Sequence, residues 1–349
     1  MKIAQIAPLY ESVPPKYYGG TERVVSYLTD ELVAMGHEVT LFASGDSETK
    51  ARLMPQSKIA LRLDETVVDP VARHVLLAEK VFQMAGEFDV IHSHIEYFCY
   101  SHMRSSAVPL ISTMHGRMDI PDLVPVYEEF REVPVISISH SQRKPLPWLN
   151  WTGNVYHGLP EKLYAYHEKA GDYLAFVGRV SPEKGLAAAI DIAIRAEKTI
   201  KIAAKVDKND RDYFKSVIRP LLNHPLVQFI GEIGESEKSD FFGNAAALIS
   251  PIDWPEPFGL VMIEAMACGT PVITRPCGSV PEIIEDGVNG YIAETAKEAV
   301  EAVRRISKIN RRGCRDVYEK KFTTRHMAEN YVDIYKKIIE EAADPLKAA

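Results

Sequence analysis

The sequence predicts an α/β protein built from two parallel sheets with helices on both faces. Short apolar runs alternate with helical patterns along almost the whole chain, and parallel strands need such crossover helices between them. The alternation stops at a polar link at about 158–171 and then starts again. With 349 residues, the chain is long enough for two domains of ordinary size. We therefore expect two Rossmann-like domains that face each other across a cleft.

The first half is expected to contain a sheet that is buried on both faces. Its strands show continuous apolar runs without alternation, at 3–7, 38–43, 89–92, 109–114, 133–137 and 154–157. Helical patterns lie between most of them, at 21–35, 70–85, 121–132 and 139–149. Gly36 follows the first helical pattern, in the position where glycine commonly ends a helix.

The second half repeats this organisation. Strands are expected at 173–177, 199–205, 227–230, 247–250 and 271–274, with helices at 186–197, 210–222, 236–244 and 259–267. Ser279 and Glu282 have the spacing of a capping box, so we expect Glu282 to have a structural rather than a chemical role. A last helix at 323–341 has apolar residues at helical spacing, so it needs a surface to cover.

Composition excludes several classes of protein. The net charge is −7, with 14 basic and 19 acidic residues up to residue 160 and 27 and 29 beyond it, so neither half has the basic excess of a nucleic-acid binder. No apolar run reaches the length of a membrane span, so we expect no stable membrane insertion. The four cysteines show no paired spacing, which favours free thiols and a cytoplasmic protein.

Two glutamates of the second half are the strongest candidates for ligand binding. Glu256 lies in a loop between two prolines, and Glu264 lies in the helix expected at 259–267, which is otherwise apolar or small. A carboxylate on a helix packed on every side is costly unless something donates hydrogen bonds to it. No Lys or Arg lies one turn away, so the partner is distant in sequence or not protein. The alternative is a buried helix whose one glutamate reaches solvent.

A sugar attached to a phosphate would satisfy these carboxylates. Two adjacent sugar hydroxyls can both donate to one carboxylate. The helix that carries Glu264 begins near Phe258 and Gly259, so its free backbone N–H groups form an anion site beside Glu256. Together these features predict a pocket for a phosphate with a sugar on each side.

Two cations follow the first strand of the second half. Arg179 and Lys184 lie between the strand at 173–177 and the next helix, at the edge where parallel sheets bind ligands. Arg can bind two phosphate oxygens at once, whereas Lys supplies a compact charge. The alternative is a pair of solvated loop charges neutralised by Glu183. Their position in the same half as the two glutamates favours phosphate binding.

The first half offers further candidates. Gly19 and Gly20 precede a helix and would allow a ligand close to backbone N–H groups, although a plain turn is an equal alternative. Histidines follow two predicted strands, at 92–94 and at His115, and His115 is the best candidate for contacting a substrate hydroxyl. The chain lacks the residue spacing of a known metal site, and it contains no D-x-D carboxylate pair. We therefore expect no metal and no cofactor.

These residues, in this order, resemble the family-4 retaining glycosyltransferases of the GT-B fold. The resemblance covers nearly the whole chain and is most specific at 178–185, at Glu256 with Glu264, and in the runs 264–272 and 278–290. It implies that residues 1–160 bind the acceptor and that residues 161–322 bind a nucleotide-diphospho-sugar. It also implies that the helix at 323–341 crosses back onto the first domain.

The resemblance implies a role for each candidate. Arg179 and Lys184 would bind the diphosphate, Glu256 the donor sugar and Glu264 the ribose hydroxyls. Phe258, Gly259 and Leu260 would offer backbone N–H groups to sugar and phosphate. Gly19 and Gly20 would cover the phosphates from the first domain. The ring of His115 would contact an outer hydroxyl of the sugar. Four of the residues would act on the reacting groups: Arg179, Lys184, Glu256 and His115.

The expected reaction is metal-independent transfer of a hexose to an acceptor hydroxyl with retention of configuration. A UDP-hexose is preferred as donor and GDP-mannose is an alternative, while the acceptor is a small molecule or saccharide, with Tyr10, Tyr17, Tyr18 and Tyr97 as candidate lining. Alternatives are a nucleotide-sugar epimerase of the same fold, a non-catalytic sugar-nucleotide-binding subunit, and a dinucleotide-dependent oxidoreductase. The missing G-x-G-x-x-G fingerprint argues against the last.

Overall fold

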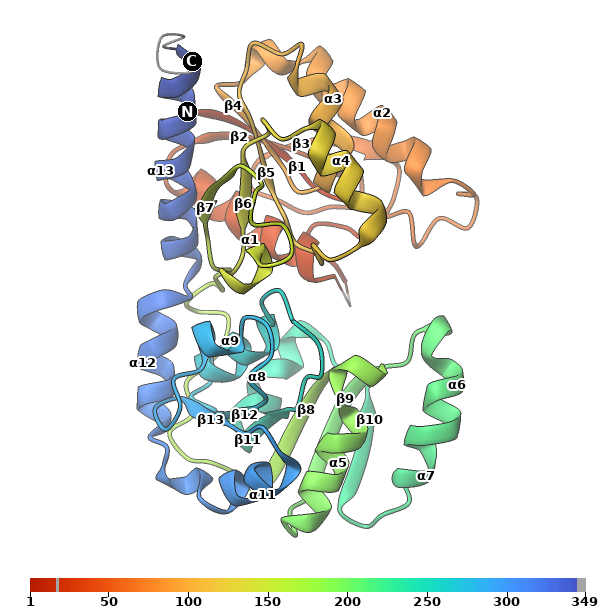
Figure 1. Ribbon diagram of the computed structural model, residues 1–349, viewed down its shortest axis with the longest axis vertical. Coiled ribbons are helices and arrows are strands. Elements are labelled where there is room, and N and C mark those ends of the chain that lie inside the picture. Colours follow the sequence, from red (N-terminus) through yellow and green to blue (C-terminus); the bar gives the residue numbers. More distant parts are fainter. Residues whose placement is uncertain (17–18, 344–349) are drawn as a thin grey trace. The chain divides into compact units, whose positions relative to one another are not determined.

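The computed structural model describes residues 1–16 and 19–343 (Figure 1). The chain forms two compact units. The first comprises Met1–Gly158 together with the C-terminal segment that starts at Thr324, and the second comprises Leu159–Thr323. Each unit is built on its own parallel sheet, which confirms the predicted fold class.

The sheet of the first unit has seven strands in the order β3-β2-β1-β4-β5-β6-β7. They are β1 (Lys2–Ile6), β2 (Glu38–Ser44), β3 (Arg52–Ser57), β4 (Val90–Ser93), β5 (Leu110–Thr113), β6 (Val135–Ser137) and β7 (Trp151–Asn154). Strand β3 was not predicted, because it is a half-exposed edge strand that contains Pro55 and lacks an apolar run. The strand expected at 154–157 lies earlier, at β7.

Five α-helices accompany this sheet in the described residues: α1 (Gly20–Ala34), α2 (Pro70–Gln83), α3 (Tyr100–Met103), α4 (Val124–Glu129) and α13 (Thr324–Ala343). The side chain of Asp69 caps α2 by accepting from the backbone N–H of Val71 at 2.9 Å. The helix predicted at 139–149 is wrong, since only a short 3-10 turn at Ser141–Arg143 forms there. Pro145 and Pro147 remove backbone donors and prevent its continuation.

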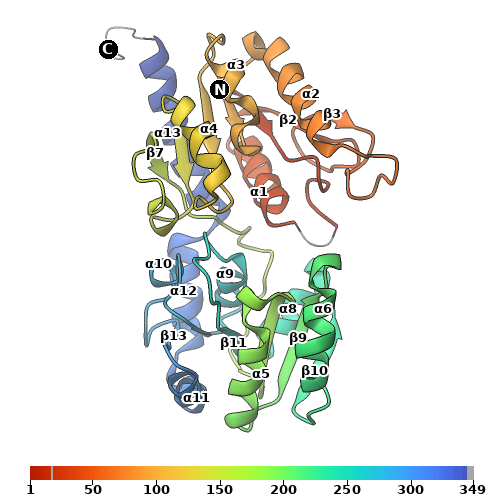
Figure 2. The same cartoon turned by 45° about the vertical axis from the view of Figure 1, so that its right-hand side comes forward.

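The last helix packs on the first unit, as predicted. Helix α13 runs beside α1 (Figures 1 and 2). The side chains of Tyr331 and Tyr335 on this helix are fully buried. The amide of Gln5, on the central strand β1, donates to the hydroxyl of Tyr335 at 3.1 Å. The C-terminal segment is therefore part of the core of the first unit.

The sheet of the second unit has six strands in the order β10-β9-β8-β11-β12-β13. They are β8 (Tyr173–Arg179), β9 (Ile200–Lys205), β10 (Val227–Gly231), β11 (Ala245–Ser250), β12 (Val272–Thr274) and β13 (Gly290–Ile292). The short strand β13 was not predicted. All described strand pairs of both sheets are parallel, so their carboxyl ends lie at one edge of each sheet.

The α-helices of the second unit are α5 (Leu186–Arg195), α6 (Arg211–Tyr213), α7 (Arg219–Leu221), α8 (Glu235–Gly243), α9 (Leu260–Ala267), α10 (Val280–Ile283), α11 (Ala296–Arg304) and α12 (Arg311–Lys321). The helix predicted at 210–222 is interrupted by a π turn at Phe214–Ile218, just before Pro220. The predicted capping box is wrong, because the Ser279 hydroxyl donates instead to the carbonyl of Phe258 at 2.7 Å.

Two expectations from composition, on the cysteines and on membrane-spanning segments, can be compared with the structure. The four cysteines are free, as predicted. Across residues 1–16 and 19–343, every helix is too short or too polar to cross a membrane.

Candidate active site

The loop after β8 brings Lys184 toward the start of α9. Strand β8 ends at Arg179, a 3-10 turn spans Pro182–Lys184, and α5 begins at Leu186. Between them, Gly185 has a left-handed backbone with φ 72°, and a Cβ there would lie 2.2 Å from the carbonyl oxygen of Pro251. Only glycine permits this close approach of the loop to the end of β11.

Lys184 and Glu256 form an ion pair. The ammonium of Lys184 lies 2.5 Å from Oε2 of Glu256, although the residues are 72 positions apart. The indole N–H of Trp254 donates to the same oxygen at 2.8 Å. The side chains of Lys184 and Glu256 retain 22% and 12% of their exposure, so the pair is partly shielded from solvent. The structure thus brings these two predicted site residues together.

Arg179 has acidic partners of its own. Its guanidinium donates to Glu183 at 2.6 Å and lies 3.5 Å from Asp210. The alternative expected from the sequence for Arg179 is a loop charge paired with Glu183. The structure contains this pair. The side chain of Arg179 is about one-third exposed, at 34%. A phosphate would have to compete with two carboxylates for this guanidinium.

Helix α9 begins at a glycine and without a side-chain cap. Gly259 precedes its first residue, Leu260, and has φ 85°, while the neighbouring Phe258 is buried. The N-cap residue Gly259 makes no side-chain hydrogen bond to the first N–H groups of α9. These donors belong to the same loop as Glu256, which is the arrangement that an anion site beside this glutamate requires.

Glu264 is buried and carries a cationic partner that the sequence did not reveal. Its side chain is 4% exposed, and Oε1 accepts from the ammonium of Lys238 on α8 at 2.7 Å. Lys238 also lies 3.4 Å from Glu235. The partner is distant in sequence, which was one of the two expected possibilities. Local pattern could not identify Lys238, because only the packing of α8 against α9 brings it to Glu264.

The segment after β12 supports the Glu256 loop. Gly278 has φ 60°, and a Cβ there would lie 2.3 Å from the backbone oxygen of Glu256. The backbone N–H of Ser279 donates to this same oxygen at 3.0 Å. The Ser279 hydroxyl bonds the carbonyl of Phe258, as described above. This segment positions Glu256 and the start of α9, a role that its local pattern did not suggest.

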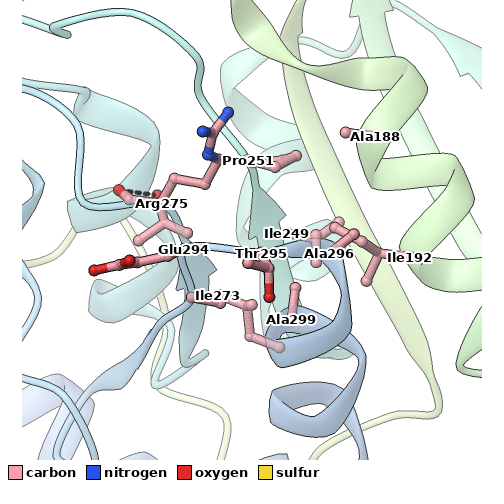
Figure 3. Close-up of a pocket in the computed structure, with 12 residues that line it drawn as sticks. Ala188, Ile192, Ile249, Pro251, Ile273, Arg275, Glu294, Thr295, Ala296 and Ala299 are labelled. Carbon is pink, nitrogen blue, oxygen red and sulfur yellow. Dashed lines mark hydrogen bonds between the residues drawn. The ribbon is translucent and has the colours of Figure 1, made fainter.

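A separate pocket of about 280 Å³ lies at the carboxyl ends of β11, β12 and β13 (Figure 3). Its lining is mainly apolar, with Ile192, Ile249 and Ile273 among the side chains. Arg275 also lines it, but its guanidinium pairs with Asp253 at 2.5 Å. None of the predicted site residues lines this pocket, so it is distinct from the Lys184–Glu256 site.

In the first unit, Gly19 precedes α1 and Gly20 is its first residue. Gly19 is buried, and a Cβ there would lie 2.8 Å from Pro15 and 3.1 Å from Oε2 of Glu22. Glu22 is itself buried, and burial raises the pKa of its carboxyl. A phosphate beside Gly19 would therefore meet an acidic side chain. The predicted phosphate contact of these glycines gains no support from this geometry.

His115 follows β5 and is part of a histidine cluster. Its Nε2 lies 2.8 Å from Nδ1 of His94, and its ring stacks on His157 with 5.3 Å between centroids. Burial lowers the pKa of His115 to about 3. Throughout the described residues, no three or more His, Cys, Asp or Glu side chains are arranged to hold a metal ion. Of the tyrosines proposed to line an acceptor site, Tyr17 and Tyr18 lie outside the described residues.

Two family models match overlapping parts of the chain. The model of Glycosyltransferase Family 4 matches 18–183, and the model of Glycosyl transferases group 1 matches 166–322. An uncharacterized glycosyltransferase of Methanocaldococcus jannaschii is 25% identical, over 97% of this chain and 99% of its own length.

Solved structures share the fold. A glycosyltransferase involved in avilamycin A biosynthesis has a TM-score of 0.75 and 24% identity, covering 97% of this chain and 98% of its own. The Anabaena protein HepE in complex with UDP-glucose has a TM-score of 0.73 and 17% identity, covering 97% of this chain and 100% of its own. These similarities extend through both units.

Proposed function

The chain belongs to the family-4 glycosyltransferases of the GT-B fold, and we propose that it transfers a hexose from a nucleotide-diphospho-sugar to a hydroxyl group of an acceptor. Retention of the anomeric configuration, independence of metal ions and a UDP-hexose donor are parts of this proposal. The acceptor is proposed to be a saccharide or another small molecule.

The observation that carries the proposal is the contact of Lys184 with Glu256 beside the uncapped start of α9. When the bond between the sugar and the diphosphate breaks, negative charge grows on the leaving oxygens. A fixed ammonium and oriented backbone N–H groups stabilise that charge without reorganising. Glu256 holds Lys184 in place and can also accept from a hydroxyl of the departing sugar.

Glu264 is the proposed anchor for the ribose. Lys238 engages its Oε1, so Oε2 is the oxygen that we assign to the two ribose hydroxyls. The hydrogen bond from this ammonium also holds the buried carboxylate in one orientation. In this scheme Lys238 acts as a positioning residue of the donor site.

Several finer points rest on chemistry and on the family. UDP is preferred as the carrier because HepE, which has the same fold, is in complex with UDP-glucose in its crystal structure. The cations Lys184 and Arg179 supply the positive charge at the diphosphate, which is why we propose no metal ion. We assign no catalytic base, and the leaving phosphate is the group proposed to take the acceptor proton. A cytoplasmic location fits the four free cysteines.

The experiment that tests the proposal combines binding and turnover. We expect UDP and UDP-glucose to raise the melting temperature more than GDP, ADP and their hexoses do. With UDP-glucose and a panel of saccharide acceptors, we expect release of UDP in the presence of EDTA and an α-linked product by NMR. Absence of stabilisation by every nucleoside diphosphate would overturn the proposal, and a β-linked product would overturn retention.

A further inference from the structure

Buried polar side chains of the first unit form a continuous chain from α13 to His115. Tyr335 on α13, Gln5 on β1 and His92 on β4 are fully buried, and His94 follows directly after β4. Such a buried network is stable only when each donor meets an acceptor, so its proton positions are coupled.

The links of this chain are short. The hydroxyl of Tyr335 lies 2.7 Å from Nδ1 of His92 and 3.1 Å from Nε2 of Gln5. The carbonyl oxygen of Gln5 lies 2.8 Å from Nε2 of His94. Nδ1 of His94 lies 2.8 Å from Nε2 of His115. Each step falls within ordinary hydrogen-bond distance.

The three rings of the chain are neutral. Burial lowers the pKa of His92 and of His94 well below the usual range, and it lowers the pKa of His115 to about 3. A neutral imidazole has one nitrogen that donates and one that accepts. The position of a single proton on each ring therefore decides the direction of every bond in the chain.

The orientation of Gln5 decides these positions. Its amide nitrogen donates to Tyr335, so its carbonyl oxygen accepts from Nε2–H of His94. Nδ1 of His94 then has no proton and accepts from Nε2–H of His115. The remaining nitrogen of His115, Nδ1, carries a lone pair, and the hydrogen bonds of the described residues leave it unengaged.

The other end of the chain is consistent with this direction. Tyr335 donates its hydroxyl proton to Nδ1 of His92, so the proton of His92 resides on Nε2. That nitrogen donates to the hydroxyl of Thr113 at 2.7 Å, which in turn lies 3.0 Å from the hydroxyl of Tyr331 on α13. The network is thus attached to the C-terminal helix at two tyrosines, Tyr335 and Tyr331, and its other end is His115.

We propose that this chain holds His115 as a hydrogen-bond acceptor toward the substrate, with His94 as its positioning residue. The inference rests on the proposed function and on the role that the family resemblance implies for His115, which is contact with an outer hydroxyl of the donor sugar. A sugar hydroxyl can donate a hydrogen bond to the unprotonated Nδ1 of His115. The carboxylate of a uronic acid has no proton to donate, so its negative charge would lie against the lone pair of this nitrogen. The site therefore selects a hexose with a free hydroxyl at that position over the corresponding uronic acid.

The proton positions can be measured without activity. If the Gln5 amide were reversed, every bond would reverse, and His92, His94 and His115 would all carry their protons on Nδ1. Long-range ¹H–¹⁵N correlation spectra of the ¹⁵N-histidine protein at neutral pH distinguish the two arrangements. We expect all three rings to be protonated on Nε2. A proton on Nδ1 of His115 would overturn the inference, whatever the protein is found to transfer.

Variants test the role of His94. His94→Asn keeps an amide oxygen near the position of Nδ1, whereas His94→Phe fills the space without an acceptor. We expect His94→Phe to lower kcat/KM for UDP-glucose by about 10- to 100-fold, the range found when an orienting outer residue is lost, and His94→Asn to restore most of it. The preference for UDP-glucose over UDP-glucuronate should fall with His94→Phe. Equal loss in both variants would contradict a positioning role.

A second variant keeps the inference testable if His94→Phe fails to fold. Tyr335→Phe removes one hydroxyl from α13 and preserves the ring, so the amide nitrogen of Gln5 loses the nearer of its two acceptors and keeps only Nδ1 of His92, at 3.3 Å. We expect the ¹⁵N spectrum of His115 to show a mixture of Nε2–H and Nδ1–H forms. An unchanged spectrum would show that α13 does not control His115. Binding of UDP to the unmodified protein, measured separately, tests the proposed function itself.

Discussion

At the scale of single residues, the predicted donor site depends on charges that are partly or fully removed from water. Lys184 and Glu256 are partly buried together, and Lys238 and Glu264 are buried more deeply. The first pair includes a cation that is proposed to bind phosphate, whereas in the second pair the cation orients an anion. Substitutions in the two pairs should therefore have different consequences.

Lys184→Ala should mainly affect catalysis. The variant loses one donor to the leaving diphosphate, which costs on the order of 3 kcal/mol in the transition state, or about a hundredfold in kcat. Glu256 keeps the indole N–H of Trp254, so the protein should stay folded. Steady-state kinetics with UDP-hexose measure the effect, with the exposed Lys297→Ala as a charge-matched control. A loss of less than threefold would remove Lys184 from the site.

Lys238→Ala should mainly affect stability. It leaves the Glu264 carboxylate buried without its ammonium, which costs about 3–5 kcal/mol in the free energy of unfolding. The double variant Lys238→Ala with Glu264→Gln removes both charges and should recover much of this loss, and Glu264→Gln alone completes the cycle. Denaturant unfolding of the single and double variants gives the coupling energy. Additive effects would show that the pair is not coupled.

At the scale of elements, the start of α9 depends on one backbone conformation. Gly259, which precedes the first residue of α9, adopts φ 85°. This backbone conformation sets the direction of the first turn of the helix. A Cβ there would lie 2.7 Å from the flexible end of Met262 and 3.5 Å from Cγ of Glu256, which is an ordinary contact, so the backbone is the main constraint.

Gly259→Ala should weaken both folding and donor binding. The left-handed conformation costs a residue with a Cβ roughly 1–2 kcal/mol. Gly287→Ala is a matched control, because Gly287 has φ 78° and open space around its Cβ position. We expect similar losses of thermal stability in both variants and weaker UDP binding only in Gly259→Ala, by calorimetric titration. Equal binding in the two variants would contradict the proposed role of this helix start.

At the scale of the whole molecule, the two units should respond differently to acid. Burial lowers the pKa of six histidines in the first unit, namely His37, His74, His92, His94, His115 and His157. Their folded pKa values lie below the unfolded value of about 6.5, so the unfolded state binds more protons under acidic conditions. The stability that they contribute is therefore complete above pH of about 6.5 and is lost as the pH falls below it.

The first unit should thus open before the second on acidification. Each such histidine removes up to about 1.4 kcal/mol of unfolding free energy per pH unit below its unfolded pKa. Hydrogen exchange followed by mass spectrometry at pH 7 and pH 5, corrected for intrinsic exchange, should show faster opening in β4, β5 and α13 than in β8 and β11. His74→Gln keeps an acceptor for the backbone N–H of Leu9 and should reduce the difference. Uniform opening of both sheets would contradict the prediction.

The sequence by itself determined the architecture of this protein and indicated several candidate site residues. Buried strands and amphipathic helices repeat locally, so their alternation indicated two parallel sheets. Glu256, Glu264 and Lys184 were recognisable because their residue types conflict with, or interrupt, these local patterns. Local patterns failed where proline broke a helix, at 145 and 147, and where an edge strand such as β3 lacked an apolar run.

Only the tertiary structure decided which charged and polar groups meet. Lys238 reaches Glu264 across 26 residues, and Gln5 reaches Tyr335 across 330. Contacts of this kind arise from the packing of separate elements, and no periodicity along the chain records them. The same reason hid the contact between His94 and His115, because it depends on two neighbouring strands ending side by side. Chain pattern is a local property, whereas burial and hydrogen-bond partnership are properties of the folded molecule.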